Sequence, residues 1–362
     1  MKSMRCWAKI IVLAHVVRCR LDWARHGTIE EFQRDTPRYT LRCPLFKGAD
    51  LSESRRKWFL PVRHKNKSYR WTAKHANACV GDAIEAPSPA AARAALRGQT
   101  VVFAGDSLAL QNYLSMAALL VCDGDDGVEF QRPEGRLSTT FLPRDNVTVR
   151  YVQANFGVET ERGAAAGAAW FEDHLGKKQQ IKATGSTTVV RPWASPAIHG
   201  DLARAIDDYA NRSDVTYFVN FGHWVSSIRS DVQFFDAAGP LRDDRRIFAY
   251  EALLKATSTA IARRLAPTQR AVFSSYVPGR HDSADEACSE DGLRWGAAAR
   301  RGVGKRLDHD GVYFLDASCP LARVPESAYA DGDITHGHLP GAPDLASALL
   351  ARLLACYPGR PG

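Results

Sequence analysis

The sequence predicts an α/β fold built on a mainly parallel β-sheet, because short apolar runs alternate with helical segments from residue 100 onward. The runs are TVVFAG (100–105), VTYFVNFG (215–222), RAVFSSYV (270–277) and GVYFLDAS (311–318). Each run is rich in β-branched and aromatic residues and is bounded by turn residues, which is typical of a strand buried on both faces. Such strands are joined by helical crossovers, which makes them parallel.

Four segments beside these runs have helical character. They are LALQNYLSMAALL (108–120), DLARAIDDYANR (201–212), RRIFAYEALLKATSTAIARRL (245–265) and DLASALLARLLACY (344–357). The last is amphipathic and closes the chain. The stretch between residues 123 and 200 is mixed in pattern and rich in Gly and Ala. We expect it to be an insertion within a main domain that spans residues 99–358.

The residues before this domain divide into two predicted segments. In residues 1–40, basic side chains precede the apolar run Ile10–Val17, which is similar to a secretory signal or a short membrane anchor. A buried helix is the alternative interpretation of that run. Residues 41–98 are rich in Arg, Lys and Trp and end in EAPSPAAARAALRG. We expect them to form a small irregular subdomain that bears cysteines.

Cysteine and asparagine usage favours the secretory pathway. The chain has eight cysteines, and six remain if a leader carrying the first two is removed. An even set is typical of a disulfide framework, although buried free thiols are the alternative. Three of the seven asparagines, Asn66, Asn146 and Asn211, stand in N-glycosylation acceptor sequences. We therefore expect the protein in the Golgi lumen or outside the cell.

The net charge of the chain restricts the possible classes of binding partner only in part. A net charge of +8, spread along the sequence, favours acidic partners in general, such as anionic glycans, membranes or nucleic acid. The sequence has no zinc-type CxxC pair, phosphate-binding Walker loop, RNA-binding aromatic signature or internal repeat. We expect no nucleic-acid partner and no metal or other cofactor. The only membrane contact expected is through the short N-terminal anchor.

Polar residues follow three of the predicted strands. Ligands of open α/β sheets bind beyond the carboxyl ends of the strands, so these positions are the first place to look for a site. The residues are Asp106 and Ser107 after the first run, Asn220, Gly222 and His223 after the second, and Asp333 and His336 in a loop after the last.

Acyl transfer needs residues of these types. A serine hydroxyl is a weak nucleophile that requires a base within hydrogen-bond reach and an acid that orients the base. Ser107 fits the nucleophile, His336 the base and Asp333 the orienting acid, while His338 competes with His336 by spacing alone. Ser107 is also expected to cap the helix that follows it, since serine before a helix is usually an N-cap.

A developing oxyanion requires preorganised donors. The backbone N–H of Ser107 at the helix start and the side-chain amide of Asn220 are the expected donors. We expect Asp106, Gly222 and His223 to add oxyanion or substrate contacts. Each also has an ordinary structural interpretation, in a turn or against the core.

The amino-acid sequences of these segments and their order along the chain resemble those of the plant trichome-birefringence-like proteins and related PC-esterases. LRGQTVVFAGDSLALQNYLSMAALL is similar to their GDS block, VNFGHWV to their N-x-G-H-W block, and DGDITHGHLPGAPDLASALLARLL to their terminal D-x-x-H block. CPLFKG and YRWTAKHANAC are similar to their cysteine-bearing N-terminal portion. The resemblance covers residues 40–356, with a weak middle.

The resemblance implies a three-layer fold like that of the SGNH hydrolases and an enzyme that O-acetylates cell-wall polysaccharides. It implies that Ser107 carries the acyl group, His336 rather than His338 is the base, and Asp333 orients the base. Asn220 and Gly222 would then be oxyanion-hole or structural residues. The implied partners are an acyl donor and a polysaccharide or oligosaccharide acceptor, with the oligomeric state left open.

Two other functions remain compatible with the sequence. A carbohydrate esterase would use the same triad, with water in place of the sugar hydroxyl. A catalytically silent glycan-binding protein is suggested by four departures from the family pattern. These are Leu110 in place of the usual Arg, and Ile334, Gly337 and His338 in the terminal block.

Overall fold

The fold was analysed in a computed structural model. The residues that it describes are 21–25, 45, 69–73, 88–122, 128–131, 138–163, 187–194, 196–226, 232–241, 245–275, 290–304, 311–315, 336 and 350. Side chains are described at all of these positions except 21–25, 69–73, 162, 163, 187 and 290–293. The predicted helix over 344–357 lies outside the described residues, apart from Leu350.

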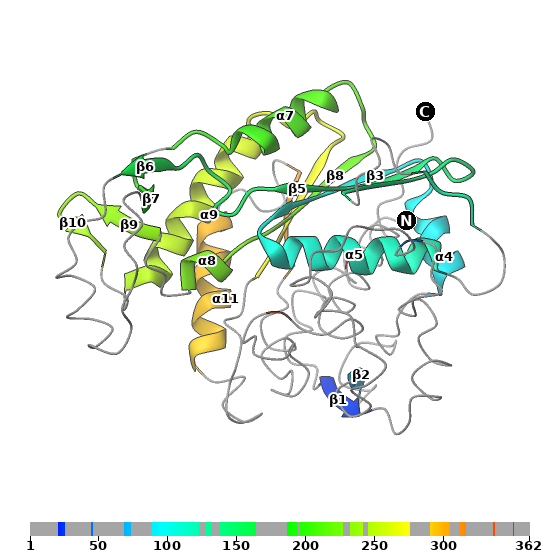
Figure 1. The fold of residues 1–362 in the computed structure, drawn as a ribbon, viewed down its shortest axis with the longest axis horizontal. Coiled ribbons are helices and arrows are strands. Elements are labelled where there is room, and N and C mark those ends of the chain that lie inside the picture. The colour runs from blue at the N-terminus through cyan, green and yellow to red at the C-terminus, as the bar shows by residue number, and fades with distance from the viewer. Residues whose placement is uncertain are drawn as a thin grey trace, which may run out of the picture.

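A six-stranded sheet forms the centre of the molecule, with strand order β12-β11-β8-β3-β5-β4 (Figure 1). All neighbouring strands are parallel except β4, which runs antiparallel to β5 at one edge. The expected α/β class with a mainly parallel sheet is therefore confirmed. The bounds are Thr100–Gly105 for β3, Thr139–Leu142 for β4, Val147–Gln153 for β5, Val215–Asn220 for β8, Arg270–Ser274 for β11 and Val312–Leu315 for β12.

The four apolar runs singled out in the sequence become β3, β8, β11 and β12. Every residue of β3 and of β8 is buried, as expected for strands covered on both faces. The predicted helices over 108–120, 201–212 and 245–265 are α5 (Ser107–Val121), α7 (Gly200–Asp208) and α9 (Arg246–Ala262). The helices and strands predicted from the sequence pattern therefore match the observed elements to within a few residues, wherever the structure describes those residues.

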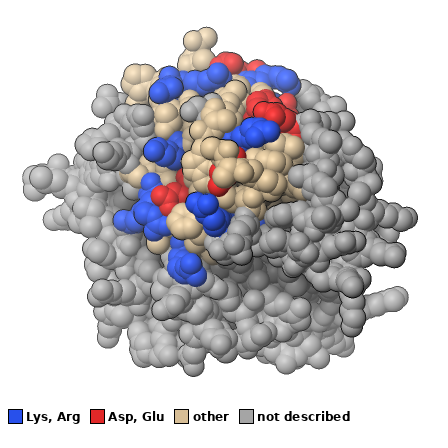
Figure 2. All heavy atoms as spheres, turned by 90° about the vertical axis from the view of Figure 1, so that its left-hand side faces the viewer, with Lys and Arg blue, Asp and Glu red and all other residues tan. Residues whose placement is uncertain are grey.

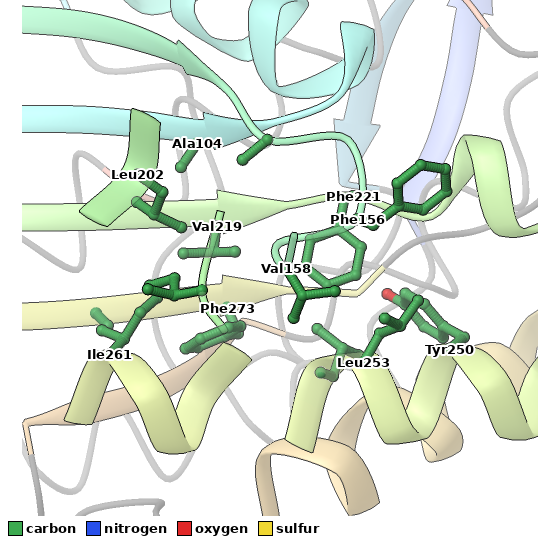
Figure 3. Packing of buried hydrophobic residues seen from close by; sticks show 14 of the residues in the cluster. Ala104, Phe156, Val158, Leu202, Val219, Phe221, Tyr250, Leu253, Ile261 and Phe273 are labelled. Atoms are coloured by element: carbon green, nitrogen blue, oxygen red, sulfur yellow. The ribbon is translucent and has the colours of Figure 1, made fainter. Parts of the chain in front are cut away.

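Helices cover both faces of the sheet. The helices α4 (Pro89–Leu96) and α5 share one hydrophobic cluster with Val101 and Phe103 of β3. The helices α7, α9 and α11 (Glu290–Val303) share the other cluster with Val102 and Ala104. Figure 3 shows the second cluster, where side chains of α9 face those of the strands. The alternation along β3 sends successive side chains to opposite layers, so the sheet is the middle of three layers.

The strand order reverses between β3 and β8. Along the chain the sheet grows from β3 to β5 on one side, and then from β3 to β8, β11 and β12 on the other. The chain leaves β3 into α5 on one face and leaves β8 towards α8 (His223–Ser226) and α9 on the other. The carboxyl ends of β3 and β8 therefore border the crevice where doubly wound sheets bind ligands.

Several segments predicted as separate parts also contribute to the fold. Within the stretch expected as an insertion, β4 and β5 belong to the central sheet. A second sheet, ordered β10-β9-β7-β6, contains β6 (Glu161–Gly163) and β7 (Thr187–Val190) from that stretch, with β9 (Val232–Asp236) and β10 (Gly239–Pro240). Strand β1 (Leu21–Arg25) pairs antiparallel with β2 (Tyr69–Ala73), and α4 packs on α5. The proposed domain boundaries remain predictions.

Positive and negative side chains are interspersed on the surface that carries the second sheet. Figure 2 shows this face. Arg191, which follows β7, pairs with Glu161 of β6, and Arg245 pairs with Asp236 of β9. On α7, Arg204 pairs with Asp201. Part of the positive charge is therefore neutralised locally. In the part of the chain that the structure describes, no helix is both long and apolar enough to cross a bilayer.

Gly105 allows the ends of β3 and β8 to approach each other. A Cβ atom at this position would lie 1.7 Å from the backbone oxygen of Asn220, the residue paired with Gly105. The φ angle of Gly105 is +151°. Gly98 also has a positive φ, +74°, but no atom lies within 4 Å of the Cβ it would carry. A side chain at Gly98 would therefore introduce backbone strain alone, whereas a side chain at Gly105 would introduce both backbone strain and steric overlap.

We expect Gly105→Ala to destabilise the protein far more than Gly98→Ala. The Gly98 substitution should cost roughly 1–2 kcal/mol, the penalty for an L-residue in a left-handed conformation. The Gly105 substitution should cost about 3 kcal/mol or more, because overpacking adds to that penalty. Urea denaturation of both variants measures the difference. Equal losses in the free energy of unfolding would contradict the close approach of the two strands.

Candidate functional site

The helix that follows β3 begins at Ser107, and its N-cap is Asp106. The Asp106 carboxylate accepts a hydrogen bond from the backbone N–H of Leu108 at 2.9 Å. The expectation that Ser107 itself caps the helix is therefore wrong. Aspartate is as good an N-cap as serine, and it stands one residue earlier in the turn. The hydroxyl of Ser107, at the first helical position, is left for other contacts.

The Ser107 hydroxyl lies next to the imidazole of His336. The distance from Ser107 Oγ to His336 Nε2 is 2.5 Å, although 229 positions separate the two residues in the chain. Both side chains are half-buried, so the pair borders solvent. This contact has the nucleophile-to-base geometry that serine acyl transfer requires. Asp333 and His338 lie outside the described residues.

The Asp106 carboxylate connects the two turns at the carboxyl ends of β3 and β8. Besides its bond to Leu108, it accepts the backbone N–H groups of Gly222 and His223, each at 3.0 Å. Its side chain is fully buried. Burial raises the pKa of the Asp106 carboxyl to about 6, while the three N–H donors and the charge of His336 act in the opposite direction. The sequence placed Asp106 at the edge where Ser107 and His336 meet, and its observed partners are backbone N–H groups of the two turns at that edge.

Gly222 and His223 take part in this arrangement through their backbones. Because the N–H of Gly222 donates to Asp106, its observed contact fits the structural alternative better than an oxyanion donor. The ring of His223 meets the ring of His336 edge-on, with 5.5 Å between centroids, and meets Trp224 at 6.4 Å. The ring of His223 therefore lies beside His336.

Two groups at this edge could donate hydrogen bonds to a negatively charged oxygen. The N–H of Ser107 is at the first position of α5, where helical N–H groups lack an intrahelical acceptor, and it has no acceptor among the described residues. The side chain of Asn220 is 5% exposed, and its Oδ1 has no hydrogen-bond partner among the described residues. Half a turn of the amide would exchange its oxygen and its NH₂ group. Asn220 can therefore supply a second donor at this edge.

The sequence analysis missed Tyr151 of β5. Its hydroxyl donates to the backbone oxygens of Gly105 and Asp106, with oxygen–oxygen distances of 3.4 and 3.3 Å. Tyr151 thereby supports the turn that carries Ser107 from the neighbouring strand. It belongs to no motif and lies in the stretch expected as an insertion. Only the pairing of β5 with β3, which places Tyr151 opposite Phe103, could have indicated it.

The described residues contain no cluster of three or more side chains that could hold a metal ion. No known protein-family model matches the chain, and no curated protein matches it. The chemistry of the site therefore has to be inferred from its own geometry.

We expect Asp106→Ala to destabilise the protein and Ser107→Ala to leave its stability nearly unchanged. Removing the Asp106 carboxylate deprives three N–H groups of their acceptor. Each buried N–H group left without an acceptor costs about 1–3 kcal/mol. Removal of the buried charge partly offsets this loss of stability. The Ser107 variant loses no cap, so its free energy of unfolding should change by less than about 0.5 kcal/mol. Chemical denaturation at pH 7 compares the two. A larger loss in Ser107→Ala would mean that its hydroxyl has a capping role.

Proposed function

We propose that this protein is an acyltransferase with an SGNH-hydrolase-like fold, which O-acetylates a polysaccharide through an acyl-enzyme on Ser107. The contact between Ser107 Oγ and His336 Nε2 carries the proposal. Its place at the reversal point of the sheet supports it, since that is where doubly wound folds bind their ligands. The resemblance to the trichome-birefringence-like proteins supplies the substrate class.

In the first half of the reaction, the acyl group moves from the donor to Ser107. His336 takes the proton from the Ser107 hydroxyl as Oγ attacks the carbonyl carbon of the donor. The tetrahedral intermediate has its negative oxygen near the N–H of Ser107 and the amide of Asn220. The carbon–leaving-group bond then breaks, and the leaving group receives the proton from His336. Asp333 is assigned to orient His336.

In the second half, a sugar hydroxyl resolves the acyl-enzyme. His336 removes the proton of that hydroxyl, its oxygen attacks the acyl carbon, and Ser107 recovers a proton from His336 as the acyl–oxygen bond breaks. The acetyl donor is consumed as a co-substrate, and the steps require no resident cofactor. If water attacks in place of the sugar, the same residues perform ester hydrolysis, so a carbohydrate esterase is the alternative enzyme.

The aligned Ser107 and His336 favour an enzyme over a silent glycan-binding protein. One of the four departures that suggested the silent protein is Leu110. Its side chain is buried in the cluster between α5 and the sheet, so the substitution fills the core there. Ile334, Gly337 and His338 lie outside the described residues. A binding protein would need no serine within 2.5 Å of a histidine ring nitrogen.

Two observations support a location in the secretory pathway. Cys122 is disulfide-bonded, which suits an oxidising compartment. Asn146 and Asn211, two of the three acceptor asparagines, are exposed. The third, Asn66, lies outside the described residues. We propose the Golgi lumen or the cell exterior as the site of action.

We expect Ser107→Ala to abolish labelling by a fluorophosphonate probe and to abolish acetyl transfer. His336→Ala should reduce labelling strongly, because the hydroxyl loses its base. Ser88→Ala is the matched control: this exposed serine caps α4 and is remote in sequence from the site. A chromogenic acetyl ester is supplied with and without xylan, mannan or pectin oligosaccharides, and products are identified by mass spectrometry.

Acetyl found on a sugar only with intact Ser107 would establish the transferase. Acetate released only to water would favour the esterase. A folded protein that neither binds the probe nor turns over the ester would overturn the proposal in favour of a glycan-binding protein.

A further inference from the structure

Among the described residues, Asp106 is the only acidic residue that is completely buried, and it immediately precedes Ser107 in the chain. Its Oδ1 accepts the N–H of Leu108 from the helix that carries Ser107. Its Oδ2 accepts the N–H groups of Gly222 and His223 from the turn after β8. One carboxylate therefore joins two turns that begin on neighbouring strands.

We propose that Asp106 is a positioning residue whose ionised carboxylate locks these two turns together and attracts the positive charge that His336 gains during acyl transfer, and that protonation of Asp106 switches the site off. The regulatory part of this inference rests on the proposed function, because it concerns activity. The ionisation of Asp106 can be tested without turnover.

The positioning role follows from a closed series of contacts. Asp106 holds the backbone of His223, the ring of His223 packs edge-on against His336, and His336 contacts Ser107. Ser107 is the chain neighbour of Asp106, which completes the series. A shift of either turn would change the distance between nucleophile and base. Errors of about 1 Å in such a distance can cost 100-fold in rate.

The electrostatic role follows from the charge that appears during acyl transfer. When His336 takes the proton of Ser107, its ring becomes positive. The ionised carboxylate of Asp106 and the charge of His336 attract each other. Because Asp106 is buried, solvent screens this attraction weakly. The ionised carboxylate therefore favours the charge separation of that step.

The titratable groups beside Asp106 among the described residues are few. His336 is the one whose charge acts on it. His223 contributes a backbone N–H, with its ring turned to His336, and Tyr151 contacts the backbone oxygen of Asp106. No lysine or arginine of the described residues is among the groups that shift the pKa of Asp106. Its ionisation thus depends on burial, the N–H donors and the state of His336.

The proposal predicts opposite effects of acid on activity and on stability. Burial raises the pKa of the Asp106 carboxyl from 3.8 to about 6. As the pH falls from about 6 towards 3.8, the folded protein binds a proton that the unfolded chain does not. The contribution of this carboxyl to the free energy of unfolding therefore increases over that window and is lost as the pH rises through about 6. Activity falls over the same window, because the charge that serves His336 is removed.

We expect Asp106→Asn to lower kcat about 100-fold with little change in KM, and to change the acid side of the pH profile of kcat, because the variant has no carboxyl group to protonate. Asp145→Asn is the matched control, because Asp145 pairs with the exposed Arg97 at the opposite end of the sheet. Kinetics of the wild type and both variants with the acetyl ester give kcat and KM as functions of pH, while circular dichroism checks that the fold persists.

An unchanged kcat with an unchanged pH profile in folded Asp106→Asn would overturn the inference, since a carboxylate that served only stability would leave both unaltered. If the variant does not fold, carbon-13 titration of the carboxyls in the wild type decides the matter. An Asp106 signal that titrates near pH 6 supports the inference, and titration below pH 4 refutes it. Wild-type protein without acyl activity would refute the proposed function, while this titration would still test the ionisation of Asp106.

Discussion

The Asp106 carboxylate accepts N–H groups from two turns that lie 116 positions apart in the chain, and the geometry of the site depends on this contact. Parallel strands place their carboxyl ends at one edge of a sheet, but they do not align the loops that follow. Here a single buried anion aligns them, because its oxygens can accept several N–H groups at once. Without it, the turns at Ser107 and at His223 would lose a side chain that bonds to both.

The strands must first approach closely enough for that contact to form. Gly105 ends β3 opposite Asn220, where any larger residue would overlap the neighbouring backbone. Every residue of α5 from Ala109 to Val121 is buried, so the helix that begins at Ser107 has a fixed place against the sheet. Tyr151 supports the same turn from the other side. A rigid scaffold of this kind is what a reacting pair needs, because small displacements are costly in rate.

The sequence was informative where burial produces a simple pattern. The fully covered strands β3 and β8 appear as continuous apolar runs, and polar residues at their ends pointed to the edge where Ser107 lies. Strand β5 was missed because only one of its faces is well covered, so that its buried and partly exposed residues alternate imperfectly. The partnership of Asp106 with Gly222 and His223 could not be predicted, because it depends on how two loops meet. Local propensity carries no information about such long-range contacts.

The choice of aspartate as the N-cap has a chemical consequence for the serine beside it. A serine that caps a helix directs its oxygen at the N–H groups of the first turn, and that acceptor is then occupied. With Asp106 as the cap, Ser107 moves to the first helical position, and its Oγ is free to meet His336. The N–H of Ser107 remains at the positive end of the helix dipole, where it favours negative charge. Asp106 also places a buried carboxylate at the end of the sheet where Ser107 and His336 meet. The turn that holds this buried group is therefore also the turn that presents Ser107 to His336.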